Sequence, residues 1–246
     1  ARPLTFLDYI ANDKLNPEII EEIVAGMVGA CKETGVSLVG GETAEMPDTY
    51  LSGEHDLVGV ITGVVEKESI ITGKSIVPGD SVLGLPSNGL HTNGYSFARK
   101  LFFDIGKYDV HDSIPELEKP IGLTLLEPHI NYTNHVFAVL DNNIDIKGIA
   151  HITGGGLLEN IPRILPDNCG VKIQKKVWPT PPVFNVMQHI GKVDENEMYR
   201  TFNMGIGMVF IVDSSNINIV KNALNNLTDV YEIGTVVKGK KEVSVE

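Results

Sequence analysis

The sequence predicts an α+β protein with two domains, built from mixed sheets that are flanked by helices, and the pattern alone leaves mixed α/β as the alternative. Short apolar runs alternate with stretches of helical periodicity along the chain, which is typical of sheets covered by helices. Several neighbouring strands are suited to antiparallel pairing, which argues against a purely parallel sheet. A polar, turn-rich stretch from 67 to 80, with Gly73 and Pro78-Gly79, separates two regions. We therefore predict domains over residues 1–66 and 67–246.

The first region contains one well-marked helix. Asn16 is suited to cap it, Pro17 to its first turn, and Gly35 to its end. Between them, apolar residues recur at helical spacing: Ile20, Ile23, Val24, Met27 and Cys31. The region also holds two predicted strands, residues 36–39, which end at Gly40-Gly41, and residues 57–65.

The second region repeats the alternation of strands and helices. Its predicted strands are residues 81–85, 148–152, 171–173, 205–212 and 230–237. Its predicted helices are residues 95–103, 129–140, a short stretch after Gly156, 181–190 and 216–227. The polar connection 105–121 is expected to hold little regular structure.

Composition and charge exclude several classes of function. The 246 residues include 20 Lys and Arg against 32 Asp and Glu, a net charge of −12. So acidic a surface repels polyanions and argues against a general binder of nucleic acid or of anionic membranes. A phosphorylated small molecule stays possible if a metal ion and backbone N–H groups offset the charge.

Cysteine usage and the absence of targeting signals predict a cytoplasmic protein. Cys31 and Cys169 have no CxxC spacing and cannot make a disulfide framework, so we expect small buried side chains in a reducing compartment. No stretch approaches the roughly 20 apolar residues of a membrane span. The chain starts with Ala1-Arg2-Pro3 and no Met, which either a processed Met or an absent front part would explain.

Three glycine-rich loops follow predicted strands, where backbone N–H groups are exposed and a ligand can approach closely. The first is GGETAEMP at 40–47, in which Glu42 and Glu45 lie three residues apart. Two such carboxylates suit a Mg²⁺ ion that keeps waters and binds substrate phosphates. The alternative is a turn with two solvated acids, in which Thr43 caps a helix.

The second loop, SNGLHTNGYS at 87–96, gathers Ser, Asn, His and Thr side chains ahead of a helix. These groups could hold ribose hydroxyls or a phosphate, and His91 could donate to a developing oxyanion or shuttle a proton. The alternative is a hydrogen-bonded loop in which Asn93 or Ser96 caps the helix and His91 is a satisfied polar side chain.

The third loop, HITGGG at 151–156, places three glycines before a helix, as in a phosphate cradle, but without the Lys of a Walker loop. The alternative is a tight turn with His151 hydrogen-bonded in the core. A fourth segment, 197–205, contains Arg200, a cation that could bind a phosphate. A surface ion pair is the other interpretation of Arg200.

Four motifs in this order resemble one enzyme family. They are GGETAEMP (40–47), SNGLHTNGYS (87–96), HITGGGLLENIPRILP (151–166) and EMYRTFNMGIGM (197–208). Together they resemble the phosphoribosylformylglycinamidine cyclo-ligases, or aminoimidazole ribonucleotide synthetases, of purine biosynthesis. The resemblance covers essentially the whole chain. It implies a fold shared with thiamine-monophosphate kinase and selenophosphate synthetase, with the first domain in a β-barrel formed across a homodimer.

The resemblance also implies a reaction and its site residues. ATP would phosphorylate the amide oxygen of formylglycinamidine ribonucleotide, and ring closure would give 5-aminoimidazole ribonucleotide, ADP and phosphate, with Mg²⁺ as the metal. The implied catalytic residues are His91 and His151. The implied ATP and metal residues are Gly41, Glu42 and Thr43, with Glu42 toward the ion. The implied substrate and phosphate residues are Ser87, Asn88, Gly89, Asn93, Thr153, Gly154, Gly155, Gly156, Arg200 and Asn203.

The chain departs from the family's pattern at its front, where the family signature ends in Gly-Ala-x-Pro and this chain opens at Ala1-Arg2-Pro3. We therefore expect an incomplete first domain. Two alternatives to the cyclo-ligase stay open. One is another ATP-using enzyme of the same fold, such as thiamine-monophosphate kinase or selenophosphate synthetase. The other is a catalytically silent fragment that dimerises and binds a sugar phosphate.

Overall fold

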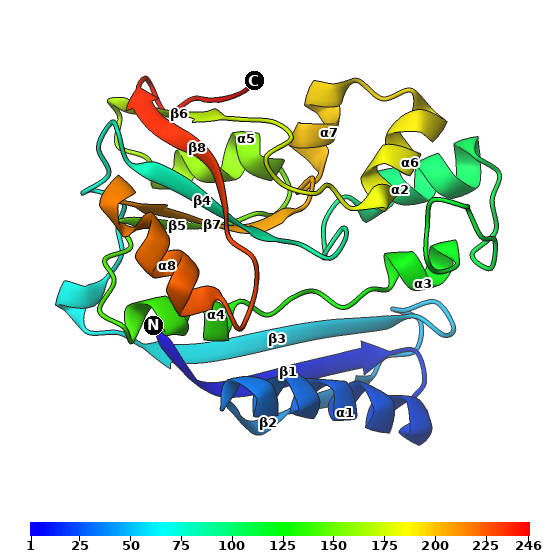
Figure 1. Ribbon diagram of the computed structural model, residues 1–246. Helices are drawn as coiled ribbons and strands as arrows, with labels where there is room; N and C mark the ends of the chain where they lie inside the picture. The colour runs from blue at the N-terminus through cyan, green and yellow to red at the C-terminus, as the bar shows by residue number, and fades with distance from the viewer. The chain divides into compact units, whose positions relative to one another are not determined.

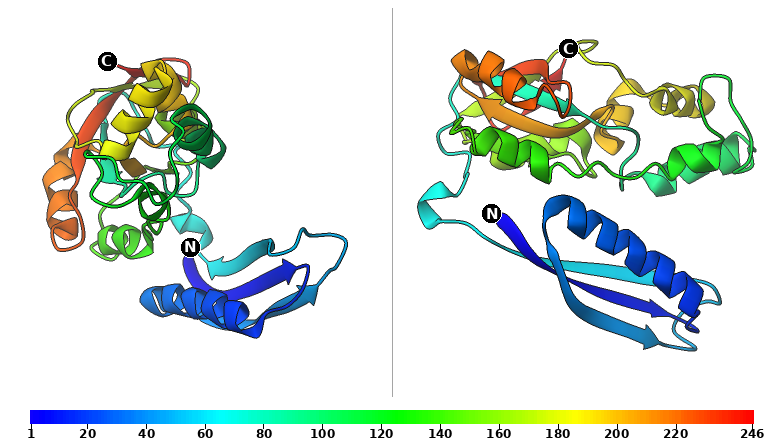
Figure 2. Two further views of the ribbon diagram at one scale, coloured as in Figure 1. Left: turned by 90° about the vertical axis from the view of Figure 1, so that its right-hand side faces the viewer. Right: turned by 60° about the horizontal axis from the view of Figure 1, so that its bottom comes forward.

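The polypeptide separates after Ile70 into two units, Ala1–Ile70 and Ile71–Glu246, in the computed structural model, which describes residues 1–246 (Figure 1). The sequence placed this boundary between residues 66 and 67, just before the short helix η1 (Lys67–Ser69). Each unit has a sheet of its own, and Figure 2 shows both from two further sides. The predicted class, α+β with mixed sheets flanked by helices, is confirmed.

The first unit is a three-stranded sheet with one long helix. Its strands are β1 (Arg2–Asn12), β2 (Ser37–Glu45) and β3 (His55–Val64), in the order β2-β1-β3. β1 runs parallel to β2 and antiparallel to β3. The helix α1 (Pro17–Thr34) makes the crossover that a parallel pair requires. β1 was not among the predicted strands.

The helix α1 begins and ends as predicted. The Asn16 side chain accepts a hydrogen bond from the Glu18 backbone N–H at 3.0 Å, and Pro17 stands in the first turn. Gly35 ends the helix in the left-handed conformation, at φ 68°.

The strand after α1 is longer than expected, and the prediction that it ends at Gly40-Gly41 is wrong. β2 continues to Glu45, because its pairing with β1 continues. The register shifts between Phe6 and Leu7 of β1, a β-bulge that Gly40 accommodates at φ 153°. Gly41 lies so close to Asp8 that an added Cβ would meet the carboxylate carbon at 2.5 Å. The two glycines therefore bend the strand instead of ending it.

The second unit is built on a six-stranded sheet with the order β5-β7-β4-β8-β6-β9. The strands are β4 (Ser81–Pro86), β5 (Gly148–His151), β6 (Cys169–Ile173), β7 (Ile206–Val212), β8 (Tyr231–Lys238) and β9 (Val243–Val245). All neighbours pair antiparallel except β6 and β9. β9 was not predicted.

Helices cover both faces of this sheet (Figure 1). One face packs against α2 (Tyr95–Arg99), η2 (Lys100–Ile105), α5 (Gly156–Asn160), η3 (Ile161–Ile164), α6 (Pro182–Gly191) and α7 (Glu195–Thr201). The other packs against α4 (Thr133–Leu140) and α8 (Ile217–Leu224), which follows η4 (Ser214–Asn216). Alternate residues of the central strands enter the two cores: Val82 and Val209 one, Leu83 and Phe210 the other. The central strands are therefore buried on both sides.

Several helical expectations differ from the structure, and α3 (Ile121–Leu125) is one helix that was not predicted. α4 begins at Thr133 and not near His129, because the Asn131 side chain accepts from the Thr133 backbone N–H at 3.0 Å and so turns the chain first. α7, which carries Arg200, was not predicted. The connection 105–121 holds little regular structure, as expected, up to α3. None of the helices combines the length and apolar character that a membrane span needs.

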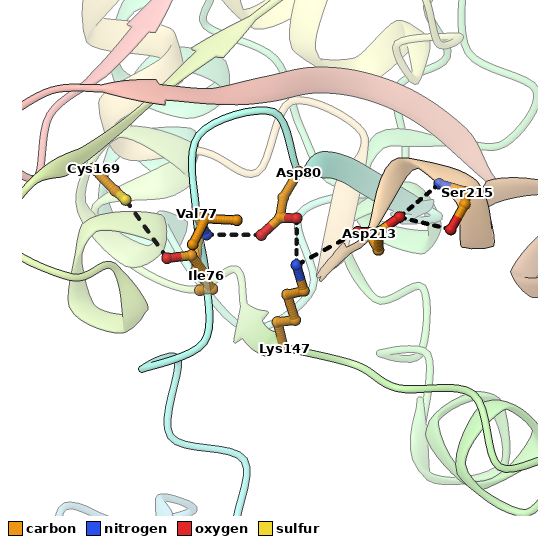
Figure 3. A network of polar contacts seen from close by, with 7 residues as sticks. All are labelled: Ile76, Val77, Asp80, Lys147, Cys169, Asp213 and Ser215. Carbon is orange, nitrogen blue, oxygen red and sulfur yellow. Dashed lines mark hydrogen bonds and ion pairs between the residues drawn. The ribbon is translucent and has the colours of Figure 1, made fainter.

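Two ion pairs of Lys147, one buried and one at the surface, join three strand ends in the second unit (Figure 3). Lys147, just before β5, lies with its Nζ 2.5 Å from Asp80, just before β4, and 3.8 Å from Asp213, just after β7. The Asp80 side chain is 3% exposed and also accepts from the Val77 backbone N–H. The nearby Cys169 is buried, as predicted, with its Sγ 3.7 Å from the Ile76 carbonyl oxygen. The network fastens the start of the second unit to its sheet.

Candidate functional site

The second and third glycine-rich loops meet at one edge of the six-stranded sheet. β4 and β5 both pair antiparallel with β7, so they run in the same direction and end at the same edge. The loop after β4 carries His91, and β5 ends at His151. β7 runs in the opposite direction and therefore begins at this edge, and the turn at Asn203 lies just before it. Segments far apart in sequence therefore supply one cluster of side chains.

His91 lies at the centre of the cluster. Its side chain is buried, its backbone is left-handed at φ 57°, and its Nε2 lies 2.9 Å from Oδ1 of Asn88. The ring of His129 stacks on it, with centroids 4.0 Å apart and planes 21° apart. Gly207 of β7 makes room for the ring, since a Cβ there would meet both His91 and the hydroxyl of Tyr132.

His129 connects the two predicted catalytic residues. Its Nε2 lies 3.1 Å from Nε2 of His151, and its Nδ1 lies 3.1 Å from the Thr92 hydroxyl. Tyr132 packs beside the rings and donates its hydroxyl to the Pro86 carbonyl at 2.6 Å. His129 was not among the predicted site residues, because residues 129–140 were predicted as a helix. In the sequence, His129 stands only between Pro128 and a predicted helix, and it belongs to none of the four motifs.

The surroundings of the three histidines favour their neutral forms. Burial, and then the charges that His129 and His151 would carry, lower the pKa of His91 to about 3. Burial lowers the pKa of His129, with a further contribution from His151, and it lowers the pKa of His151 too. The rings therefore act as neutral hydrogen-bond donors and acceptors rather than as imidazolium ions.

Ser87 and Asn203 hold the loop that carries His91. The Ser87 hydroxyl donates to Asn203 Oδ1 at 2.7 Å, and Asn203 Nδ2 donates to the carbonyl oxygens of Gly89 and Leu90 at 2.8 and 3.2 Å. The backbone N–H of Gly205 donates to the same Oδ1 at 2.8 Å. All polar atoms of the buried Asn203 side chain thus bond within the protein. Substrate contact by these residues stays a prediction.

The third loop is fastened to the second by Asn93. Asn93 Oδ1 accepts from the Gly154 backbone N–H at 3.0 Å, so it bridges loops instead of capping α2. Thr153 donates its hydroxyl to the buried Asn160 at 3.0 Å. Gly156, at φ 55°, lies against the Tyr199 carbonyl, where a Cβ would clash. Packing against α7 thus explains this glycine, and phosphate binding by the loop stays a prediction.

Arg200 forms a surface ion pair, the second of the two interpretations given for it above. Its Nε lies 3.2 Å from the Glu159 carboxylate, and both side chains are at least half exposed. Glu159 in turn packs beside Gly155, which has φ 97°. Arg200 is thus next to the glycine loop, but paired with an acid.

The proposed ATP and metal residues belong to the first unit. Gly41, Glu42 and Thr43 lie on β2, all exposed, with Glu42 opposite Tyr9 of β1. Glu45 accepts from the Leu15 backbone N–H at 2.9 Å, which gives it a structural contact. No group of three or more His, Cys, Asp or Glu side chains is placed to hold a metal ion.

Two models of known protein families match almost the whole chain. A model described as AIR synthase related protein, N-terminal domain, matches residues 1–65, and the corresponding C-terminal domain model matches residues 77–246. The chain belongs to the AIR synthase related family. The two family domains lie on either side of the division seen after Ile70.

Within this family, the chain is similar to proteins named phosphoribosylformylglycinamidine cyclo-ligase. It is 48% identical to the one from Thermoanaerobacter pseudethanolicus over 98% of this chain and 71% of that protein. It is also 48% identical to the one from Pseudothermotoga lettingae, over 100% of this chain and 72% of that protein. The family resemblance stated from the four motifs is confirmed.

Solved structures share the fold at low sequence identity. Thiamine-monophosphate kinase from Stenotrophomonas maltophilia matches with a TM-score of 0.72 and 15% identity, over 100% of this chain and 72% of that one. The hydrogenase maturation protein HypE in complex with ATP matches with a TM-score of 0.71 and 17% identity, over 100% and 70%. These likenesses establish the fold alone, which also occurs in proteins that use ATP.

Proposed function

We propose that this chain catalyses the ATP-dependent ring closure of formylglycinamidine ribonucleotide to 5-aminoimidazole ribonucleotide, with release of ADP and phosphate, in purine biosynthesis. The observation that supports it most is 48% identity to named cyclo-ligases over 98% of the chain. Similarity to thiamine-monophosphate kinase is confined to the fold, at 15% identity. The sequence therefore favours the cyclo-ligase over the other activities of this fold.

The histidine cluster suits the chemistry of this reaction. Transfer of a phosphoryl group to an amide oxygen turns a poor leaving group into a good one, and an internal nitrogen then closes the ring. Negative charge develops on the oxygen atoms during the transfer, and fixed neutral donors stabilise it. His91 and His151 lie in the neutral cluster, where such donors are held.

We propose that ATP and Mg²⁺ bind at Glu42, with Gly41 and Thr43. Exposed carboxylate oxygens suit Mg²⁺, which binds through one or two carboxylates together with nucleotide phosphates and waters. The site therefore fits a metal brought with the nucleotide and not a cage made by the protein alone. When bound, Mg²⁺ would spread the charge of the transferring phosphoryl group. Glu42 would hold the ion, and Thr43 and Gly41 would shape the strand beside it.

We also propose a homodimer formed through the first unit. The strand β3 pairs on one edge only, with β1. Its apolar side chains are about half exposed, Val58, Val60, Ile61 and Val64 among them. An apolar edge strand in water is prone to pair with another chain. Sedimentation of the wild type and of Val60→Asp tests this, because the charged variant should shift toward monomer.

The function is tested by an assay that separates phosphoryl transfer from ring closure. The purified chain is incubated with ATP, Mg²⁺ and formylglycinamidine ribonucleotide, and both ADP and the aminoimidazole product are quantified. We expect the two in equal amounts, and loss of both in His91→Ala. ADP formation on thiamine monophosphate, with no imidazole from the ribonucleotide, would contradict the proposal.

A further inference from the structure

Asn88 determines which nitrogen of His91 carries the hydrogen. Asn88 Nδ2 lies 2.8 Å from the carbonyl oxygen of Pro128. A carbonyl oxygen only accepts, so the amide must turn its NH₂ group to Pro128 and its Oδ1 to His91. Oδ1 also only accepts, and it lies 2.9 Å from His91 Nε2. His91 therefore carries a hydrogen on Nε2.

The second nitrogen of His91 is left as a lone pair. Nδ1 is buried and has no hydrogen-bond partner. A hydrogen at this position would be a buried donor without an acceptor, which destabilises a folded protein. Both the other neutral tautomer and the imidazolium ion require that hydrogen. The hydrogen bond to Asn88 and the missing partner at Nδ1 thus both favour the neutral Nε2–H form, and removal of Asn88 weakens that preference.

The ring is held in this orientation by its surroundings. His129 covers one face at 4.0 Å, and the left-handed backbone of His91 is fixed by the contacts of Asn203 with Gly89 and Leu90. Exposed Asn88 lies at the rim of the cluster. Of the two ring nitrogens, Nε2 therefore lies toward exposed Asn88, and Nδ1 is enclosed.

We propose that Asn88 is a positioning residue that holds His91 as a neutral Nε2–H donor toward an oxygen of the substrate. The proposal rests on the proposed function, in which negative charge develops on the former amide oxygen when its bond to carbon breaks and it leaves with the phosphate as the internal nitrogen closes the ring. A neutral N–H stabilises this charge without transferring its hydrogen. The substrate oxygen accepts a hydrogen bond from this N–H, either together with Asn88 Oδ1 or in its place. His91 is then neither the acid nor the base of the ring closure.

Nitrogen-15 NMR of the imidazole rings tests the tautomer without any substrate. In wild type, His91 is expected as Nε2–H. Asn88→Ala is expected to raise the share of the Nδ1–H form, whereas Asn88→Asp retains an acceptor and keeps Nε2–H. Asn142→Ala is the matched control, since exposed Asn142 also donates to a backbone carbonyl, that of Ala138. An unchanged tautomer in Asn88→Ala overturns the proposal.

Turnover provides the second readout. Asn88→Ala is expected to lower kcat by roughly tenfold, which is less than the roughly hundredfold loss of the donor itself because His91 is retained, with partial rescue in Asn88→Asp. A tautomer shift with unchanged kcat overturns the role in the reaction. Absence of cyclo-ligase activity in the wild type would refute the proposed function instead, and the NMR result would still decide the tautomer.

Discussion

Nε2 of His129 lies 3.1 Å from Nε2 of His151, so one of these nitrogens carries a hydrogen and the other accepts it. The Thr92 hydroxyl, 3.1 Å from His129 Nδ1, can either accept or donate. Two arrangements therefore satisfy this row of three residues, one with His129 donating to His151 and one with the reverse. A protonated pair satisfies neither, because both nitrogens would then be donors.

Replacing His151 tests this mutual dependence. In His151→Gln the neighbouring charge disappears, so the pKa of His129 is expected to rise toward its ordinary value, and that of His91 to rise as well. NMR titration of the imidazole C–H resonances measures both. Exposed His189→Gln is the control and should leave both titrations in place. An unaltered His129 titration in His151→Gln would contradict the interaction.

The neutral His91 predicts a loss of stability in acid. Its folded pKa of about 3 lies below the ordinary value of 6.5, so the unfolded chain binds the proton first as the pH falls. The stabilisation is complete above pH 6.5 and decreases below it, by about 1.4 kcal/mol per pH unit for one group. His91→Gln should therefore lose less unfolding free energy between pH 6.5 and 4 than wild type. Fluorescence of the buried, single Trp178 reports unfolding of this unit, and identical slopes would refute the prediction.

The ion pair of Lys147 predicts a large effect from a single substitution. Lys147→Met leaves the buried Asp80 carboxylate without its partner, which should destabilise the second unit by about 3 kcal/mol. Adding Asp80→Asn should recover part of that loss. The exposed pair Lys172–Glu246 is the control, because Lys172→Met should change stability by less than about 1 kcal/mol. Urea denaturation of the variants gives the comparison, and equal effects of Lys147→Met and Lys172→Met would refute it.

Two glycines of one motif should respond differently to alanine. Gly156→Ala introduces a Cβ at φ 55° against the Tyr199 carbonyl and should destabilise by roughly 2–4 kcal/mol. At Gly154 an added Cβ meets nothing nearer than Asn93 Oδ1, at 3.8 Å, so Gly154→Ala should stay within about 1 kcal/mol of wild type. Thermal melts measure both. Equal melting points would show that the packing against α7 does not constrain Gly156.

Substitution of Glu42 tests the proposed nucleotide site in the first unit. If Glu42 holds Mg²⁺ with ATP, Glu42→Gln should abolish turnover, because an amide oxygen is a weaker ligand than a carboxylate. The exposed position of Glu42 predicts a thermal melt close to that of the wild type. Glu22→Gln, on the exposed side of α1, is the control. Retained activity at ordinary Mg²⁺ in Glu42→Gln would remove the assignment.

What could be predicted from the sequence depended on how local the cause was. The cap at Asn16 and the end at Gly35 depend on neighbouring residues, and both were predicted correctly. The extent of β2 depends on its partner β1, and the glycines that suggested an end proved to accommodate a bulge. His91 and His151 were selected singly from their loops. Their link through His129 depends on the direction of the strands, which no local pattern contains.

The hydrogen bonds that hold the His91 loop also determine how late the histidine cluster can form while the chain is synthesised. Ser87 and its partner Asn203 are 116 positions apart, and Gly207, on which the His91 ring rests, comes later still. A chain growing from the ribosome presents the His91 loop long before it can be fastened, and such distant closure is slow. The histidine cluster is therefore among the last features of the second unit to form, and a chain arrested before β7 would carry the motif without the site.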